Sequence, residues 1–221
     1  TTTVILVGVL LVGDLFFVAK NYVDSTKFVD AFLVDQPFQS ETCDQVILKD
    51  TTKYRVFEID GAMSNARTSY FHHSIGGYHA AKPRRIQQLF DYQIAKNNIE
   101  VLNFLNVKYV IQTDDQGKKI PGVNPEANGN AWFVSDVQIV STPDEEMQAI
   151  KNLDSKKTAV INHNEFLDFR HKQPCVKDST ASIQLTSYKP NRLIYASENK
   201  NKGLVVFSEI YYAKGWNAYI D

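Results

Sequence analysis

The first twenty residues of the chain contain an almost unbroken apolar run, which covers residues 4–19 and ends at Lys20. A complete membrane-spanning helix needs about 20 apolar residues, so this run of roughly 16 is short. Asp14 interrupts it, and an acidic side chain inside a membrane is usually paired or buried in a helix bundle. The run lacks the basic leader and cleavage site of a signal peptide. We expect residues 1–22 to end a transmembrane helix that begins upstream; the alternative is a buried helix of a soluble core.

The composition is that of an ordered globular protein. The 221 residues suffice for one large domain or two small ones, and 43% of them are hydrophobic. A formal net charge of -1 argues against a general nucleic-acid binder, because such proteins need a basic excess. Cys43 and Cys175 are too few and too far apart for a zinc ribbon or a redox pair. They are compatible with one long-range disulfide or with two unrelated thiols.

Strands and helices are expected to alternate after a polar connector over residues 23–53, which contains a short helix near 44–49. The residue spacing favours strands at 54–59, 107–112 and 158–161, a strand or a strand pair at 131–140, and helices at 84–96, 99–105 and from Pro143 onward. A long polar loop is expected over 113–130. From residue 182 the pattern is typical of at least three antiparallel strands.

The expected fold class is therefore α+β with an N-terminal apolar helix. Residues 54–170 would form a mixed sheet with flanking helices. Residues 180–221 would form an antiparallel, sandwich-like β unit that the end of the chain cuts short.

One segment concentrates the side chains of a binding site. Residues 69–85 hold three of the five histidines, a pair of glycines, two tyrosines and a basic cluster. Histidine and tyrosine suit hydroxyl groups and the basic side chains suit an anion. The alternative is a structural glycine turn followed by the basic start of a helix. The candidate substrate-binding residues are Tyr70, His72, His73, Gly76, Gly77, Tyr78, His79, Lys82, Arg84 and Arg85.

Other chemistry is not supported by motifs. The chain contains no phosphate loop, no zinc-protease helix, no nucleophile elbow and no dinucleotide fingerprint. We therefore expect no cofactor, no metal site and no catalytic residue. The aromatic residues 211–219 are read as packing residues, with a platform for a sugar ring as the alternative.

Five runs together resemble the C-terminal part of YfhO-type bacterial membrane proteins. They are Asp14-Leu15 and residues 69–89, 101–111, 124–134 and 207–220. Pro83 stands where the motif of that family has leucine. Members of the family are similar to polytopic glycosyltransferases that take a sugar from an undecaprenyl-phosphate carrier.

The resemblance implies an extracytoplasmic domain in the bacterial cell membrane. Its partners would be its own transmembrane bundle, the lipid-linked sugar and an envelope polysaccharide or teichoic-acid-like polymer. The catalytic acid of such transferases lies in an early loop between membrane helices, to which nothing in this chain corresponds. The competing functions are a non-catalytic carbohydrate-binding or assembly module and a hydrolase that uses the histidine cluster.

Overall fold

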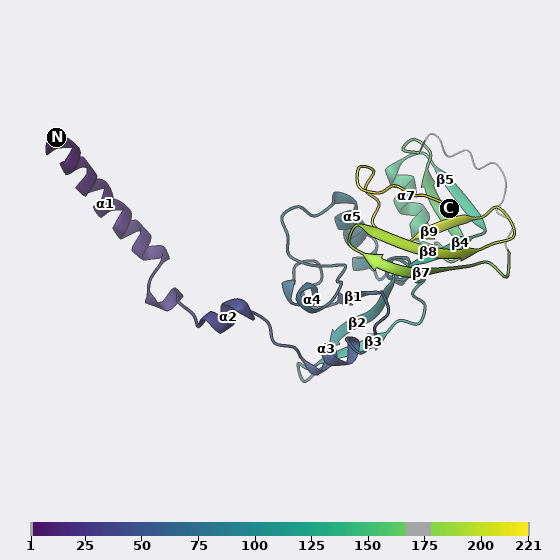
Figure 1. Ribbon diagram of the computed structural model, residues 1–221, viewed down its shortest axis with the longest axis horizontal. Coiled ribbons are helices and arrows are strands. Elements are labelled where there is room, and N and C mark those ends of the chain that lie inside the picture. Colours follow the sequence, from purple (N-terminus) through teal and green to yellow (C-terminus); the bar gives the residue numbers. More distant parts are fainter. Residues whose placement is uncertain (1, 167–177, 221) are drawn as a thin grey trace. The chain divides into compact units, whose positions relative to one another are not determined.

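The computed structural model describes residues 2–166 and 178–220, and the chain divides into two compact units, Thr1–Gln39 and Ser40–Asp221 (Figure 1). The first unit contains α1 (Thr2–Tyr22), the 3-10 helix η1 (Ser25–Lys27) and α2 (Ala31–Asp35). The expected N-terminal apolar helix is thus confirmed. Within the described residues, α1 is the one helix long and apolar enough to cross a membrane.

The second unit has the predicted α+β architecture. Its elements are α3 (Thr42–Ile47), β1 (Arg55–Glu58), α4 (Ala66–Phe71), α5 (Arg84–Tyr92), η2 (Ile94–Lys96), α6 (Ile99–Phe104), β2 (Val107–Thr113), β3 (Lys119–Val123), β4 (Ala131–Val134), β5 (Asp136–Val140), α7 (Pro143–Ile150), β6 (Thr158–Asn162), β7 (Ser182–Lys189), β8 (Arg192–Glu198) and β9 (Leu204–Phe207). This unit includes α3, which lies in the stretch 23–53 that the sequence indicates as a connector.

A three-stranded mixed sheet forms the centre of this unit. β2 lies between β1, which runs parallel to it, and β3, which runs antiparallel. Successive side chains of a strand point to opposite faces, so Val56 and Phe57 of β1 enter different cores. Val56 packs with Ile47 of α3, whereas Phe57 packs with Val101 of α6. Helices therefore cover both faces of this sheet.

The other strands form three two-stranded sheets. β5 and β6 are parallel and are joined by α7, while β4 pairs with β9 and β7 pairs with β8 in antiparallel fashion. Thr142 caps α7 by accepting a hydrogen bond from the Glu145 N–H at 3.2 Å, as its sequence predicts.

The structure departs from the expected secondary structure in several places. The sequence does not predict the helices α2 and α4, and the predicted helix 84–96 is divided into α5 and η2. β3 lies within the segment 113–130 that was expected to be a loop, and β9 pairs with β4 rather than continuing the β7–β8 hairpin.

Half-buried Arg55 ties the C-terminal strands to the central sheet. Its Nη1 donates to the carbonyl oxygens of Leu105 at 2.8 Å and Ser208 at 2.6 Å, and its Nη2 lies 3.3 Å from Glu209 Oε2. On the hairpin, the Tyr188 ring lies 3.6 Å below the Lys53 ammonium. The contacts of Arg55 hold residues 208 and 209 against β1, and the Lys53–Tyr188 contact holds the β7–β8 hairpin beside the start of that strand.

Candidate functional site

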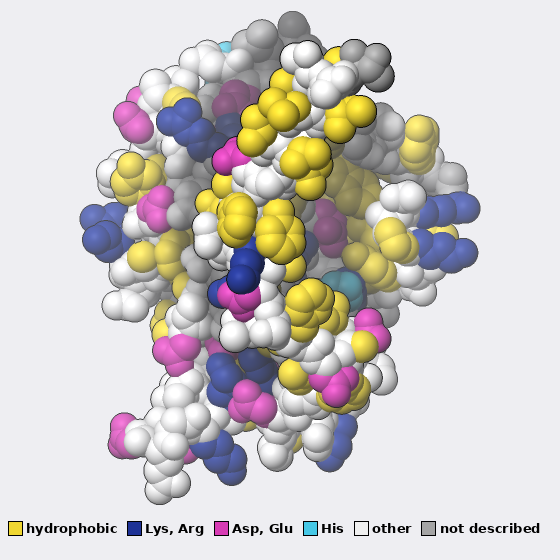
Figure 2. Space-filling view, turned by 90° about the vertical axis from the view of Figure 1, so that its left-hand side faces the viewer, with side chains coloured by type: hydrophobic (Ala, Val, Ile, Leu, Met, Phe, Trp, Pro, Cys, Tyr) yellow, Lys and Arg dark blue, Asp and Glu magenta, His cyan; other side chains and the backbone are white. Residues whose placement is uncertain are grey.

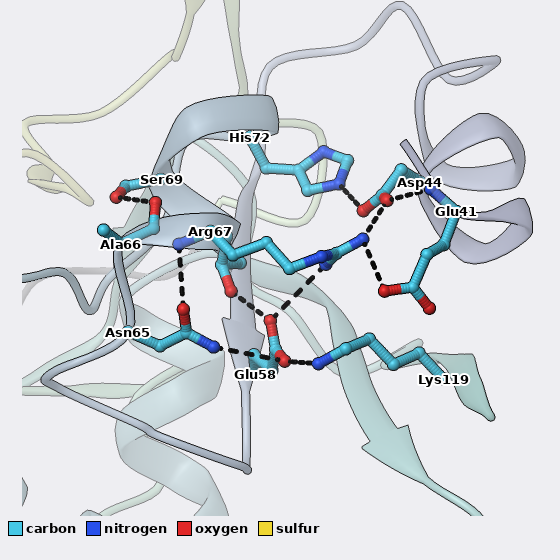
Figure 3. A network of polar contacts seen from close by, with 10 residues as sticks. Glu41, Asp44, Glu58, Asn65, Ala66, Arg67, Ser69, His72 and Lys119 are labelled. Atoms are coloured by element: carbon cyan, nitrogen blue, oxygen red, sulfur yellow. Dashed lines mark hydrogen bonds and ion pairs between the residues drawn. The ribbon is translucent and has the colours of Figure 1, made fainter. Parts of the chain in front are cut away.

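A buried ionic network lies beside β1, and its members come from four elements of the second unit (Figure 3). The buried ionic network comprises Glu41 and Asp44 at the start of α3, Glu58 of β1, Arg67 of α4, His72 at the end of α4 and Lys119 of β3. Charged side chains are seldom buried unless they are paired. The pairing within this network is therefore what permits its burial.

Arg67 is the centre of the network. Its guanidinium forms an ion pair with Asp44, lies 3.2 Å from Glu41 Oε1 and lies 3.8 Å from Glu58 Oε2. Its side chain is 10% exposed, against 0% for Asp44 and 2% for Glu58. Nη1 has no hydrogen-bond partner among the described residues, so its contact with Glu58 is electrostatic.

Local structure brings the first two members into place. Asp44 Oδ2 accepts the Glu41 N–H at 2.8 Å and so closes a capping box at the start of α3. Asn65 caps α4 by accepting the Arg67 N–H at 2.8 Å, which sets the position of Arg67. Two short helices thus present opposite charges to each other.

His72 and Asp44 form the other end of the network. His72 Nε2 lies 2.9 Å from Asp44 Oδ1, and the imidazole is 1% exposed. Burial opposes ionisation of Asp44. The Glu41 N–H, His72 and Arg67 outweigh it and lower the pKa of this carboxyl group. Burial also disfavours the charged form of Arg67 and so lowers its pKa. The charges of Asp44 and Glu41 outweigh this effect, and the pKa of Arg67 is raised.

The Glu58 carboxylate accepts hydrogen bonds from residues of α4 and of β3. Thr68 and Lys119 each donate a hydrogen bond to its carboxylate, and Asn65 Nδ2 lies 3.5 Å from it. Three carboxylates thus face two permanent cations in the network, which leaves a formal charge of -1 when His72 is neutral. The ion pairs and hydrogen bonds of the network fix α3, α4 and β3 on β1, and its inner members Asp44 and His72 are 0% and 1% exposed.

Residues 69–85, which the sequence predicts to contain a binding site, divide into a part with structural contacts and an exposed part. The structural part includes His72 in the network and His73, whose Nε2 lies 2.6 Å from Lys53 Nζ. A Cβ at Gly76 would lie 2.2 Å from the Ala62 carbonyl oxygen, so only glycine fits there. Gly77 has a φ of 144°, and Lys82 donates to the Met63 carbonyl oxygen at 2.8 Å.

The exposed part holds the remaining candidates. Tyr70, on α4, is 48% exposed, and its ring packs edge-on against Phe71. Arg85 pairs with Glu165 and lies 3.8 Å from Glu146. Tyr78 is 82% exposed, and His79 and Arg84 are also exposed. No hydrogen bond or ion pair joins these last three side chains to a described residue. We call Tyr78, His79 and Arg84 the exposed trio.

The histidines that the structure describes do not form a cluster. His72 and His73 have separate partners and His79 faces solvent, while His171 lies outside the described residues. Among residues 2–166 and 178–220, no group of three or more histidine, cysteine or acidic side chains is placed to hold a metal ion.

The sequence missed Asp44, Glu58 and Arg67. No local sequence pattern marks any of the three, because each lies among polar and apolar neighbours of an ordinary kind. They come together only through the tertiary fold.

The two cysteines are not seen as a pair in the described part of the chain. Cys43 is a buried free thiol next to Asp44, and Cys175 lies outside the described residues.

The aromatic residues near the C-terminus are largely exposed. Tyr211, Tyr212 and Tyr219 are 63%, 64% and 86% exposed. These rings are therefore available at the surface.

Comparison of the chain with models of protein families, with curated proteins and with solved structures gave no match.

Proposed function

We propose that the chain is the membrane-anchored, extracytoplasmic part of a polytopic glycosyltransferase that uses lipid-linked sugars in cell-envelope glycosylation. The observation that carries the membrane part is the exposure of α1. Its large apolar side chains from Val4 to Val18 are each between 47% and 75% exposed. Hydrophobic side chains lie uncovered on the face shown in Figure 2. Soluble proteins rarely leave such a surface uncovered.

The length of α1 supports the same proposal. Its 21 residues rise by about 1.5 Å each and so cover about 30 Å, the thickness of the hydrocarbon core of a bilayer. The second unit has its own hydrophobic cores around Ile47 and Val101. An apolar helix without buried residues, followed in the chain by a folded domain, is what we expect of a membrane-anchored protein.

Two measurements test the membrane placement. First, alkaline carbonate should leave the chain in the membrane, and deletion of residues 2–22 should release it. Second, Gln116→Cys in a Cys175→Ser background places an accessible thiol in the exposed turn before β3. An impermeant maleimide should label this thiol in intact cells, whereas Cys43 remains protected by burial. Labelling only after lysis would place the domain in the cytoplasm and overturn the proposal.

The transferase part of the proposal rests on the sequence resemblance and on the exposed trio. A phenol, an imidazole and a guanidinium at the surface suit the hydroxyl and phosphate groups of a lipid-linked sugar. His79→Ala together with Arg84→Ala in the full-length protein should reduce transfer of sugar to the envelope polymer without lowering the melting temperature. The matched control is Arg85→Ala, because Arg85 already has acidic partners. Full activity of the double variant would exclude the trio from the site.

A carbohydrate-binding module is the second candidate. The exposed rings of Tyr211, Tyr212 and Tyr219 favour it, because aromatic faces stack on sugar rings. Purified chain should then bind envelope polysaccharide without turnover, and replacement of the three tyrosines by serine should abolish binding. Transfer activity that survives this replacement would favour the first proposal.

A further inference from the structure

Three polar side chains of α1 fall on one line along the helix, whereas Thr2 and Lys20, near its two ends, lie off that line. Thr3 and Asp14 are separated by about three helical turns, and Asp14 and Asn21 by about two. All three therefore point to the same side of the helix, together with Leu10. Val12 lies on nearly the opposite side and is 69% exposed. The helix thus has a polar line on one face and purely apolar side chains opposite it.

Asp14 lies deep in this helix. It is eight residues before Tyr22, which corresponds to about 12 Å from that end, well inside a hydrocarbon core of about 30 Å. Its side chain is too short to reach the membrane surface as lysine and arginine do. No hydrogen bond or ion pair joins it to a described residue. A carboxylate at this depth is stable only beside a partner, since lipid offers none.

We propose that the Asp14 face of α1 packs against another transmembrane helix that carries a basic side chain at the same depth. The inference rests on the membrane placement of α1 in the proposed function. Charge complementarity selects this partner: an acidic group in a medium of low dielectric constant is stabilised by an opposite charge. A second copy of α1 does not fit. Its one basic residue, Lys20, lies near the helix end, and two parallel copies would place Asp14 against Asp14.

Photocrosslinking in the native membrane tests this contact. p-Benzoylphenylalanine is introduced in the full-length protein at Leu10, on the Asp14 face, or at Val12, on the opposite face. The Leu10 probe should crosslink to a membrane helix whose peptide contains lysine, arginine or histidine, and the Val12 probe should crosslink much less. Asp14→Leu should reduce the Leu10 crosslink by roughly three- to thirtyfold, the range measured for polar contacts between membrane helices.

An exchange variant is the matched control. Asp14→Val combined with Val12→Asp preserves composition and nearly preserves depth, but moves the carboxylate to the other face. This variant should lose the Leu10 crosslink as Asp14→Leu does. Equal crosslinking from both probe positions, no effect of Asp14→Leu, or a partner peptide without a basic residue would each overturn the contact. Alkaline extraction of the same samples distinguishes the claim that α1 lies in the membrane from the claim that its Asp14 face contacts another helix. Retained protein that fails these criteria refutes the contact alone, and extracted protein refutes the membrane placement as well.

Discussion

Replacement of Arg67 tests whether the buried ionic network holds the domain together. Arg67→Met keeps the length of the side chain but removes the charge between Asp44 and Glu58, whose side chains are 0% and 2% exposed. Removal of one member of a buried ion pair typically costs about 3–5 kcal/mol, because the remaining charge stays buried. For a protein of this size, that loss lowers the melting temperature by about 6–20 °C.

The stability that Arg67→Met loses should depend on pH, and the direction of this dependence follows from the pKa of Asp44. In the wild type the pKa of Asp44 is lowered on folding, so its contribution to stability is present above about pH 4 and is lost as the pH falls below that value. In Arg67→Met the pKa of Asp44 should be higher than in the wild type, because the charge and the hydrogen bond of Arg67 no longer lower it, while the Glu41 N–H and His72 remain. The folded variant would then bind a proton at a higher pH than the folded wild type, so its stability deficit should be largest at pH 7 and should shrink as the pH falls through the range in which Asp44 is protonated.

Urea unfolding in mild detergent, followed by tryptophan fluorescence, measures both effects. Asp44→Asn in the Arg67→Met background should cost less than the sum of the single variants, because it removes the stranded charge. Arg85→Met is the surface control, since its pair with Glu165 is exposed and is expected to contribute less than about 1 kcal/mol. A similarly small loss for Arg67→Met, a loss independent of pH, or additive single variants would refute the reasoning.

Three further predictions concern other parts of the second unit. Gly76→Ala should lower the free energy of unfolding by roughly 1–3 kcal/mol in the same assay, because its Cβ would meet the Ala62 carbonyl oxygen, whereas Ala80→Val at an exposed position should have little effect. Burial raises the pKa of Tyr109 to about 12, aided by Asp50, and burial with the charge of Glu209 raises that of Tyr195 to about 12. Since unfolded tyrosine ionises near pH 10, stability should fall between about pH 10 and 12, and Tyr109→Phe should make this fall shallower. Burial, with the charge of Asp44, raises the pKa of the Cys43 thiol, so a maleimide should modify Cys43 slowly in the folded chain and rapidly in urea; equal rates would show that the thiol is accessible.

Local sequence rules predicted those elements whose signals are local. α7 begins where Thr142 and Pro143 place it, because a cap and a first-turn proline act within a few residues. β3 was missed because Pro121 and Gly122 argue against a strand. The structure resolves this conflict by placing β3 at the edge of its sheet, where proline is tolerated. The partner of β9 depended on β4, some seventy residues earlier, and no local pattern encodes that pairing.

The candidate site could be predicted only in part, because the contacts of its residues depend on tertiary structure. Residues 69–85 are dense in polar groups, but the sequence does not distinguish His72, which is buried against Asp44, from His79, which faces solvent. Gly76 separates the two environments, because its close approach to Ala62 fixes the chain between them. The distinction follows from tertiary packing, and it has an experimental consequence. Loss of activity in a His72 variant can arise from unfolding, whereas His79 and Arg84 lie outside the packed interior, so their variants report on function alone.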